Sequence, residues 1–294
     1  MNTRDLEYFI SLTKLKVFSK VAEEFGVSQP TITFALKRLE KEMDAKLIIR
    51  HRTHGDLIVT DSGKQLLNHA QAIIRHFTVA KRNIANLKAK KVSIGLPPII
   101  ETRYFPKIAN SLKQEKLLHS IDTYEYGSET TKAALKNGEL DLALLGSNNP
   151  LDDPAIETEE IERIPFCAYV AKDHPLAKQG KIYFKDLAKE DFILFKQGFV
   201  QNESFNQLAK RNAFHPNVIF RSNESNNIMR LIEHNVGVGF FNSLVNTPDD
   251  VVKLEFLDED MPMFVTNLVY LKSHYFSDFQ KEVLDVIRES IKKE

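Results

Sequence analysis

The chain has 294 residues, of which 43% are hydrophobic and 27% charged, and its formal net charge is +0 at pH 7. This length exceeds one ordinary hydrophobic core and predicts two or three domains of a soluble globular protein. No apolar run approaches the about 20 residues of a membrane helix, and the N-terminus lacks the pattern of a secretory signal. The single cysteine, Cys167, excludes an internal disulfide and a cysteine-rich zinc site. We therefore expect a cytoplasmic protein with no membrane partner.

Positive charge is concentrated in the first third of the chain. Residues 1–90 carry 16 Lys and Arg against 9 Asp and Glu, a net charge of +7, and the remaining 204 residues carry 24 against 31, a net charge of −7. A basic segment joined to an acidic body favours contact of the first part with a polyanion. Because charge also fluctuates along any chain, this asymmetry alone does not decide the function.

The first 60 residues carry the pattern of short helices. The first helix has one apolar face, formed by Leu6, Phe9 and Ile10. Ser19 is the predicted cap of a second helix, and Gly26 fits the tight turn after it because glycine adopts the left-handed conformation at low cost. Ser28 is the predicted cap of a third helix, with Pro30 in its first turn, where a missing N–H costs little.

The third helix separates an apolar face from a more polar one. Its apolar face is formed by Ile32, Leu36, Leu39 and Met43. The opposite face is formed by Pro30, Thr33, Phe34, Lys37 and Lys41, with Gln29 on its flank. The following segment, KLIIRHRTHGDLIVT, predicts a strand, a tip at residues 53–56 and a returning strand. Helices joined by a glycine turn and followed by a basic hairpin predict a winged helix-turn-helix over residues 1–60.

Residues 61–90 predict one long helix that begins after a capping Thr60. Its apolar residues recur with the alternating spacing of a heptad repeat, at Leu66, Ala70, Ile73, Phe77, Ala80, Ile84 and Leu87. A stripe this narrow favours pairing with a second helix, and hence a homodimer. The alternative is an amphipathic helix that packs on its own domain.

From Lys91 onward, short apolar runs alternate with helical stretches. The runs are VSIGLPP, SIDTYEY, LDLALLG, FCAYVAK, FILFKQ, NVIFRS, VGVGFF and FVTNLVYLK. Helical stretches lie between them, at residues 128–138, 202–212 and 224–235. This alternation predicts parallel α/β sheets, and a break near residues 161–165 predicts two small lobes.

These segments together resemble the LysR-type transcriptional regulators. The likeness rests on VFSKVAEEFGVSQPTITFALKRLEKEMDAKLIIR with TDSGKQLLNHA, and downstream on GELDLALLG, AKDHPLA and NNIMRLIEHNVGVGFF. It implies a DNA-binding domain at 1–60, a dimerising linker helix at 61–90 and an effector-binding domain at 91–294. The last resembles periplasmic solute-binding proteins, with lobe I at about 91–161 and 267–294 and lobe II at about 162–266. HRTHGDL and IGLPPII further resemble activators of malolactic fermentation genes.

The start of the third helix has the features that contact with a DNA major groove requires. Its small residues allow close approach, and Gln29 can reach a base edge, whereas Phe34 would contact a thymine methyl or sugar, or else pack against the wing. Arg50 and Arg52 suit phosphates or the minor groove. The residues expected to contact double-stranded DNA are Ser28, Gln29, Pro30, Thr31, Thr33, Phe34, Lys37, Arg50 and Arg52.

The resemblance implies a small-molecule effector between the lobes. The residues expected to bind it are Pro97, Pro98, Ile99, Thr102, Ser128, Thr130, Gln197, Phe199, Gln201, Ser222, Asn223 and Ser225. Each Ser or Thr is also explained as a helix cap. Pro97 and Pro98 stand where many relatives carry hydroxyl residues and cannot donate hydrogen bonds, which weighs against carboxylate binding on that side. The malolactic likeness makes L-malate the natural effector hypothesis.

No pattern of an enzyme is present in the sequence. It contains no HExxH, phosphate-binding loop or GxSxG motif, so we expect no catalytic residues, metal or cofactor. The expected partners are a second copy of the chain, with a homotetramer as a further state, and RNA polymerase, whose access the bound effector would change by altering DNA bending. The alternative function is a solute-binding protein without DNA activity.

Overall fold

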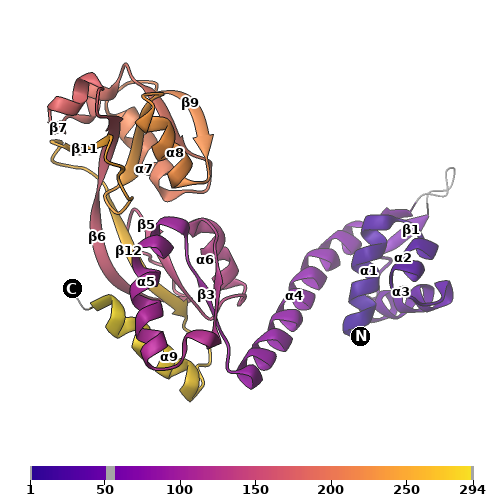
Figure 1. Cartoon of the computed structure of the whole chain (residues 1–294). Coiled ribbons are helices and arrows are strands. Elements are labelled where there is room, and N and C mark those ends of the chain that lie inside the picture. The colour runs from indigo at the N-terminus through magenta and orange to yellow at the C-terminus, as the bar shows by residue number, and fades with distance from the viewer. Residues whose placement is uncertain (1, 51–56, 293–294) are drawn as a thin grey trace. The chain divides into compact units, whose positions relative to one another are not determined.

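The structure, a computed structural model, describes residues 2–50 and 57–292 (Figure 1). The chain divides into two compact units, residues 1–85 and 86–294. Within the described residues, no helix is long and apolar enough to cross a membrane. The elements of the first unit are α1 (Thr3–Leu15), α2 (Phe18–Glu24), α3 (Gln29–Met43), β1 (Ile48–Arg50), β2 (Leu57–Val59) and the first part of α4 (Asp61–Ala89).

The first unit packs α1, α2, α3 and α4 around one small core. Leu6 and Phe9 of α1 and Leu39 of α3 are almost fully buried in it. β1 and β2 pair antiparallel, with Ile48 opposite Val59. The Thr60 hydroxyl accepts a hydrogen bond from the Gly63 N–H at 3.0 Å, so it caps α4 as its sequence position predicts.

Two details of the first unit differ from the sequence analysis. Ser19 does not cap α2, because the helix already begins at Phe18 after the extended residue Val17. The connection from α1 is only two residues long: α1 ends at Leu15, and Lys16 after it adopts the left-handed conformation. Met43 does not belong to the buried face of α3: it is 40% exposed in the last turn of the helix, beyond the reach of the core.

The second unit is a two-lobed α/β structure with one long mixed sheet. The sheet order is β4-β3-β5-β12-β6-β10-β8-β9; β11 also pairs with β6, and β7 pairs with β11. Its strands are β3 (Val92–Gly95), β4 (Ile121–Tyr124), β5 (Leu142–Ser147), β6 (Ile156–Ala171), β7 (Lys181–Ile182), β8 (Asp191–Phe195), β9 (Asn217–Ser222), β10 (Val238–Asn242), β11 (Val251–Phe256) and β12 (Met263–Leu271). Its α-helices are α5 (Pro98–Gln114), α6 (Ser128–Lys136), α7 (Val200–Arg211), α8 (Ser225–Glu233) and α9 (Asp278–Lys292).

The 16-residue strand β6 joins the two lobes. Its residues 156–165 pair antiparallel with β12, whereas residues 166–171 pair with β10 and β11. Figure 1 shows β6 and β12 running side by side from one lobe into the other. The strand is continuous through the lobe break predicted near 161–165: the backbone stays extended there, and its pairing partners change between Pro165 and Phe166.

The sheet is also less parallel than the sequence pattern predicts. β3 pairs parallel with β4 and β5, and β8 pairs parallel with β9 and β10. The pairs of β12 with β5 and β6, and of β6 with β10 and β11, are antiparallel. A chain that crosses between two lobes and later returns must run in opposite directions, which explains the mixed sheet.

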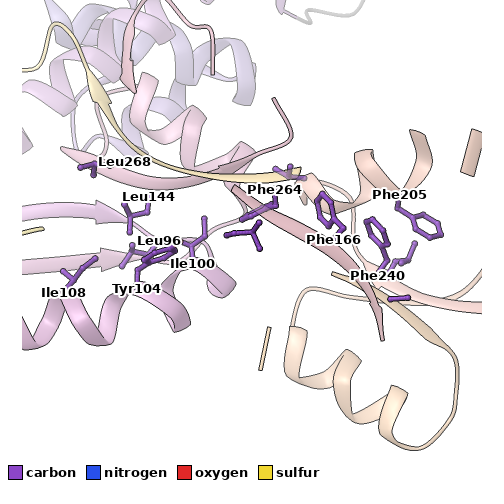
Figure 2. Packing of buried hydrophobic residues seen from close by; sticks show 14 of the residues in the cluster. Leu96, Ile100, Tyr104, Ile108, Leu144, Phe166, Phe205, Phe240, Phe264 and Leu268 are labelled. Atoms are coloured by element: carbon purple, nitrogen blue, oxygen red, sulfur yellow. The ribbon is translucent and has the colours of Figure 1, made fainter. Parts of the chain in front are cut away.

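The hydrophobic core continues from one lobe into the other. Figure 2 shows Tyr104 and Leu144 in the first lobe and Phe205 and Phe240 in the second, with Phe166 and Phe264 between the two groups. The rings of Phe166 and Phe240 stack with centroids 4.9 Å apart, and Phe264 meets Phe166 edge-on at 6.2 Å. This shared core and the two crossing strands hold the lobes on either side of the candidate effector site.

Candidate DNA interface and effector cleft

The start of α3 presents an exposed polar edge that continues into an apolar residue. Ser28 precedes the helix, and its hydroxyl lies 2.9 Å from that of Thr31 rather than capping a backbone N–H. Gln29 and Pro30 are exposed in the first turn. N–H groups at a helix start that has no side-chain cap remain available to a phosphate. The first turn of α3 therefore suits contact with a DNA backbone and with base edges.

Phe34 extends this face one turn further along α3. It is 59% exposed, and the Lys37 ammonium lies 5.9 Å from the centroid of its ring. The Thr33 hydroxyl donates to the Gln29 carbonyl at 3.2 Å. Phe34 and Lys37 together offer an apolar surface beside a positive charge, as contact with a sugar or thymine methyl next to a phosphate requires.

The two arginines assigned to the wing are only partly covered by the structure. Arg50 ends β1, where its backbone pairs with Leu57. Its side chain, and the whole of Arg52, lie outside the described residues.

The heptad stripe of α4 divides into two parts. Ala70 is fully buried and Leu66 is half-buried in the core of the first unit, as an amphipathic helix on its own domain requires. The stripe from Ile73 onward is exposed: Ile84 is 55% exposed and Phe77 41%. The first half of the helix therefore fits the interpretation of an amphipathic helix on its own domain, and pairing through the exposed second half stays a prediction.

An open cavity of about 400 Å³ lies between the lobes of the second unit. Its lining comes from the segments after β3 and β4 in one lobe and after β8 and β9 in the other. The lining residues are Pro98, Glu125, Tyr126, Gly127, Thr130, Gln197, Gly198, Phe199, Asn223 and Glu224. Parallel strand–helix units place the starts of their helices at one edge of a sheet, so the starts of α5, α6, α7 and α8 meet around this cavity.

Most of the predicted effector residues come together here. Those that line the open cavity are Pro98, Thr130, Gln197, Phe199 and Asn223. A smaller inner cavity is lined by Pro97, Ile99, Ser128 and Gln201, together with Pro98 and Phe199. The aromatic ring of Phe199 stacks on that of Phe195 with centroids 4.2 Å apart, which fixes its position at the junction of the two cavities.

Three predicted effector residues, Thr102, Ser222 and Ser225, line neither cavity. The Thr102 hydroxyl donates to the Pro98 carbonyl at 2.9 Å. The Ser222 hydroxyl accepts from the Glu224 N–H at 3.1 Å. These two hydroxyls are used in local turns, as the capping interpretation of single Ser and Thr residues expects.

Sequence reasoning missed the two glutamates of the open cavity. Glu125 follows β4 and Glu224 follows β9, so both occupy the same strand-end positions that identified their neutral neighbours. Their negative charge does not match the anion site that the helix starts suggest. Burial, and secondly the negative charge of Glu125, raise the pKa of the nearby Glu101 carboxyl above its ordinary value.

The lobes touch directly beside the cavity. The Asn148 side-chain amide, after β5 of the first lobe, donates to the Val200 carbonyl at the start of α7 at 3.0 Å. Gly127 faces Gly198 so closely that a Cβ at position 127 would lie 3.3 Å from the Gly198 carbonyl oxygen. The cleft is thus closed on one side by backbone and amide contacts.

Cys167 is a buried residue that belongs to neither candidate site. It is 1% exposed within β6, as its apolar surroundings in the sequence predict. Burial raises the pKa of its thiol to about 11. A thiol that stays protonated near neutral pH is a poor nucleophile, so Cys167 is a packing residue.

Family models match nearly the whole chain. Residues 3–64 match the bacterial regulatory helix-turn-helix protein, lysR family, and residues 85–292 match the LysR substrate binding domain. The malolactic fermentation system transcriptional activator of Lactococcus lactis is 33% identical over 290 residues, covering 98% of both chains. The regulator ShiR of Corynebacterium glutamicum is 29% identical and covers 81% of both.

Solved structures share the fold. Full-length CbnR complexed with its target DNA has a TM-score of 0.64 at 17% identity, covering 99% of this chain and 100% of that one. The effector binding domain of QuiR in complex with shikimate has a TM-score of 0.59 at 22% identity, covering 69% of this chain and 98% of that one. These findings confirm the resemblance and the predicted fold class. The chain belongs to the LysR family of bacterial transcriptional regulators: it is a DNA-binding regulator with a domain for a small-molecule effector, and not an enzyme.

Proposed function

We propose that this regulator works in the cytoplasm as a homodimer paired through the exposed half of the α4 stripe, with one α3 helix in each half of a dyad-related DNA site. The observation that supports the DNA contact is the exposed face of α3 from Ser28 to Lys37. The domains carrying these roles are residues 1–60, 61–90 and 91–294. Pairing of effector domains would join two dimers into a tetramer, and the mass in solution distinguishes the two states.

The proposed effector site is the cavity between the lobes, which draws its lining from both of them. A molecule that bridges two lobes stabilises one relative position over others and shifts the population toward it. The malolactic relative supports L-malate as the effector and malolactic genes as targets. In this scheme the regulator is an activator, and the bound effector changes DNA bending and the access of RNA polymerase.

Three measurements test this function. Selection of binding sites from a random duplex library by the full chain should yield a site with two half-sites, and selection of no sequence would leave the solute-binding alternative. A thermal-shift assay with L-malate should raise the melting temperature, because a ligand at about 100 times its Kd stabilises the folded state by about 2.7 kcal/mol. Transcription in vitro with purified RNA polymerase should then rise when malate is added.

A further inference from the structure

The helix starts around the cleft already carry carboxylates of the protein. Glu101, Glu129 and Glu203 lie in the first turns of α5, α6 and α7, and Glu224 is the residue before α8. The positive end of a helix dipole attracts a negative charge, and a glutamate of the protein already lies at each of these four helix N-termini. An effector carboxylate therefore meets helix ends whose charge is already compensated.

The lining of the open cavity has the same sign of charge. Two of its residues, Glu125 and Glu224, are exposed glutamates, and none of the described lining residues is basic. Glu101 from α5 interacts electrostatically with Glu125, Tyr126 lines the cavity beside Glu125, and the β8–α7 segment contributes the neutral Gln197 and Phe199. A fully ionised organic acid would bring like charges together in this space, which is unfavourable.

The neutral groups of the cavity suit a protonated carboxyl group instead. The amides of Gln197 and Asn223 can donate to a carboxyl C=O, and a carboxylate of Glu125 or Glu224 can accept from a carboxyl O–H. A hydrogen bond from O–H to an ionised carboxylate is short and strong. Two carboxyl groups that share a site in this way raise the pKa of one of them.

Resting on the proposed effector site, we infer that the cleft binds its organic acid together with a proton, which is shared between an effector carboxyl group and Glu125 or Glu224. The proton comes from solvent when an ionised acid binds at neutral pH. Its uptake makes the affinity depend on acidity as well as on the concentration of the acid. The two glutamates are thus specificity-determining residues that select the protonated form of the effector.

The test is calorimetric titration of the full chain with L-malate at several pH values between about 5.5 and 7.5, each in two buffers of different ionisation enthalpy. Uptake of one proton predicts that the Kd rises about tenfold for each pH unit above the titrating pKa. The dependence of the measured heat on the buffer should give about one proton taken up per site.

The double substitution Glu125→Gln and Glu224→Gln keeps the shape of both side chains and removes their charges. It should flatten the pH dependence, abolish proton uptake and strengthen malate binding near pH 7.5, a gain that damage to folding would not produce. The two single variants provide the same test if the double variant does not fold. Glu282→Gln on α9, outside the cleft lining, is the matched control and should keep the slope of the parent chain.

The results that would overturn this inference can be told apart from those that would overturn the proposed effector or the DNA-binding function. Malate binding of equal strength at all pH values, without proton uptake, overturns this inference and leaves malate as the effector. Affinity that increases with pH overturns it as well. Absence of malate binding at every pH, in a protein that still selects a DNA site, overturns both the malate assignment and the inference while the DNA-binding function stands.

Discussion

Arg38 of α3 binds the carboxylate of Asp5 in α1 through two nitrogens, with Nε 3.0 Å from Oδ2 and Nη2 2.5 Å from Oδ1. Asp5 is only 1% exposed, whereas the arginine side chain reaches it from the surface. The pair sets the position of the proposed recognition helix against the first helix. Formation of this bidentate pair, and then the charge of Asp5, raise the pKa of the Arg38 guanidinium above its ordinary value, although burial acts in the opposite sense.

Replacing Arg38 should therefore destabilise the first unit. Arg38→Ala leaves a buried carboxylate without its cation, which is more costly than losing a surface contact, so the melting temperature should fall. Arg38→Lys should fall less, because it keeps the charge but not the fork of two donors. Arg163→Ala, which removes an exposed pair with Glu160, is the control and should leave the melting temperature nearly unchanged. Equal effects of Arg38→Ala and Arg163→Ala would contradict this role.

Gln29 and Arg50 should affect DNA binding in different ways. Gln29→Ala should lower the preference for the selected site by about 1–3 kcal/mol while non-specific binding is kept, because a base-edge contact discriminates between sequences. Arg50→Ala should weaken binding to all sequences and reduce the salt slope by about 1, as expected for a phosphate contact. Fluorescence anisotropy on selected and scrambled duplexes at several salt concentrations measures both. An unchanged affinity and salt slope in Arg50→Ala would remove the wing from the interface.

The exposed half of α4 should control dimerisation. Burial of a large apolar side chain contributes about 1.5–3 kcal/mol, and a symmetric dimer buries each one twice, so Phe77→Ser with Ile84→Ser should weaken dimerisation by a factor of at least about 100. Sedimentation equilibrium measures the constant. Gln71→Ser, exposed on the same helix but off the stripe, should have no effect. A dimer that survives the double substitution would place the interface elsewhere.

Asn148 should couple effector binding to the approach of the lobes. Asn148→Ala removes the 3.0 Å hydrogen bond to the Val200 carbonyl, which joins the two lobes. We expect this hydrogen bond to strengthen when an effector draws the lobes together, so malate affinity should fall by up to about fivefold, the equivalent of one hydrogen bond of about 1 kcal/mol. Asn149→Ala, at the adjacent exposed position, is the control. Unchanged affinity in Asn148→Ala would show that this contact does not change with the bound state.

How well the sequence predicted the structure depended on burial pattern. The segment 156–163, IETEEIER, forms the first half of β6 but carries four glutamates, since one face of this half is open to solvent. No continuous apolar run marks it, so the sequence pointed only to the buried second half. The heptad stripe was correct in spacing, but spacing alone does not tell that Ala70 packs inside one unit while Ile84 stays exposed.

The two candidate sites also differ in how far the sequence alone predicts them. The exposed face of α3 follows from helical periodicity, because all its residues lie on one helix. The cleft is assembled from four segments far apart in the chain, and only their arrangement reveals that Glu125 and Glu224 line one cavity. The charges of the two glutamates act together only because the fold brings them to one cavity, and this proximity cannot be read from either local sequence.

The change of partners along β6 has a mechanical meaning. Pro165 pairs with β12 and the next residue, Phe166, pairs with β10, so the two halves of the sheet are joined to one backbone on either side of a single peptide bond. A displacement of one lobe must enter the other as torsion of this strand and of β12 beside it, rather than as sliding. The lobes are therefore connected through two continuous strands. A ligand that changes the position of one lobe relative to the other must change the twist of β6 and β12.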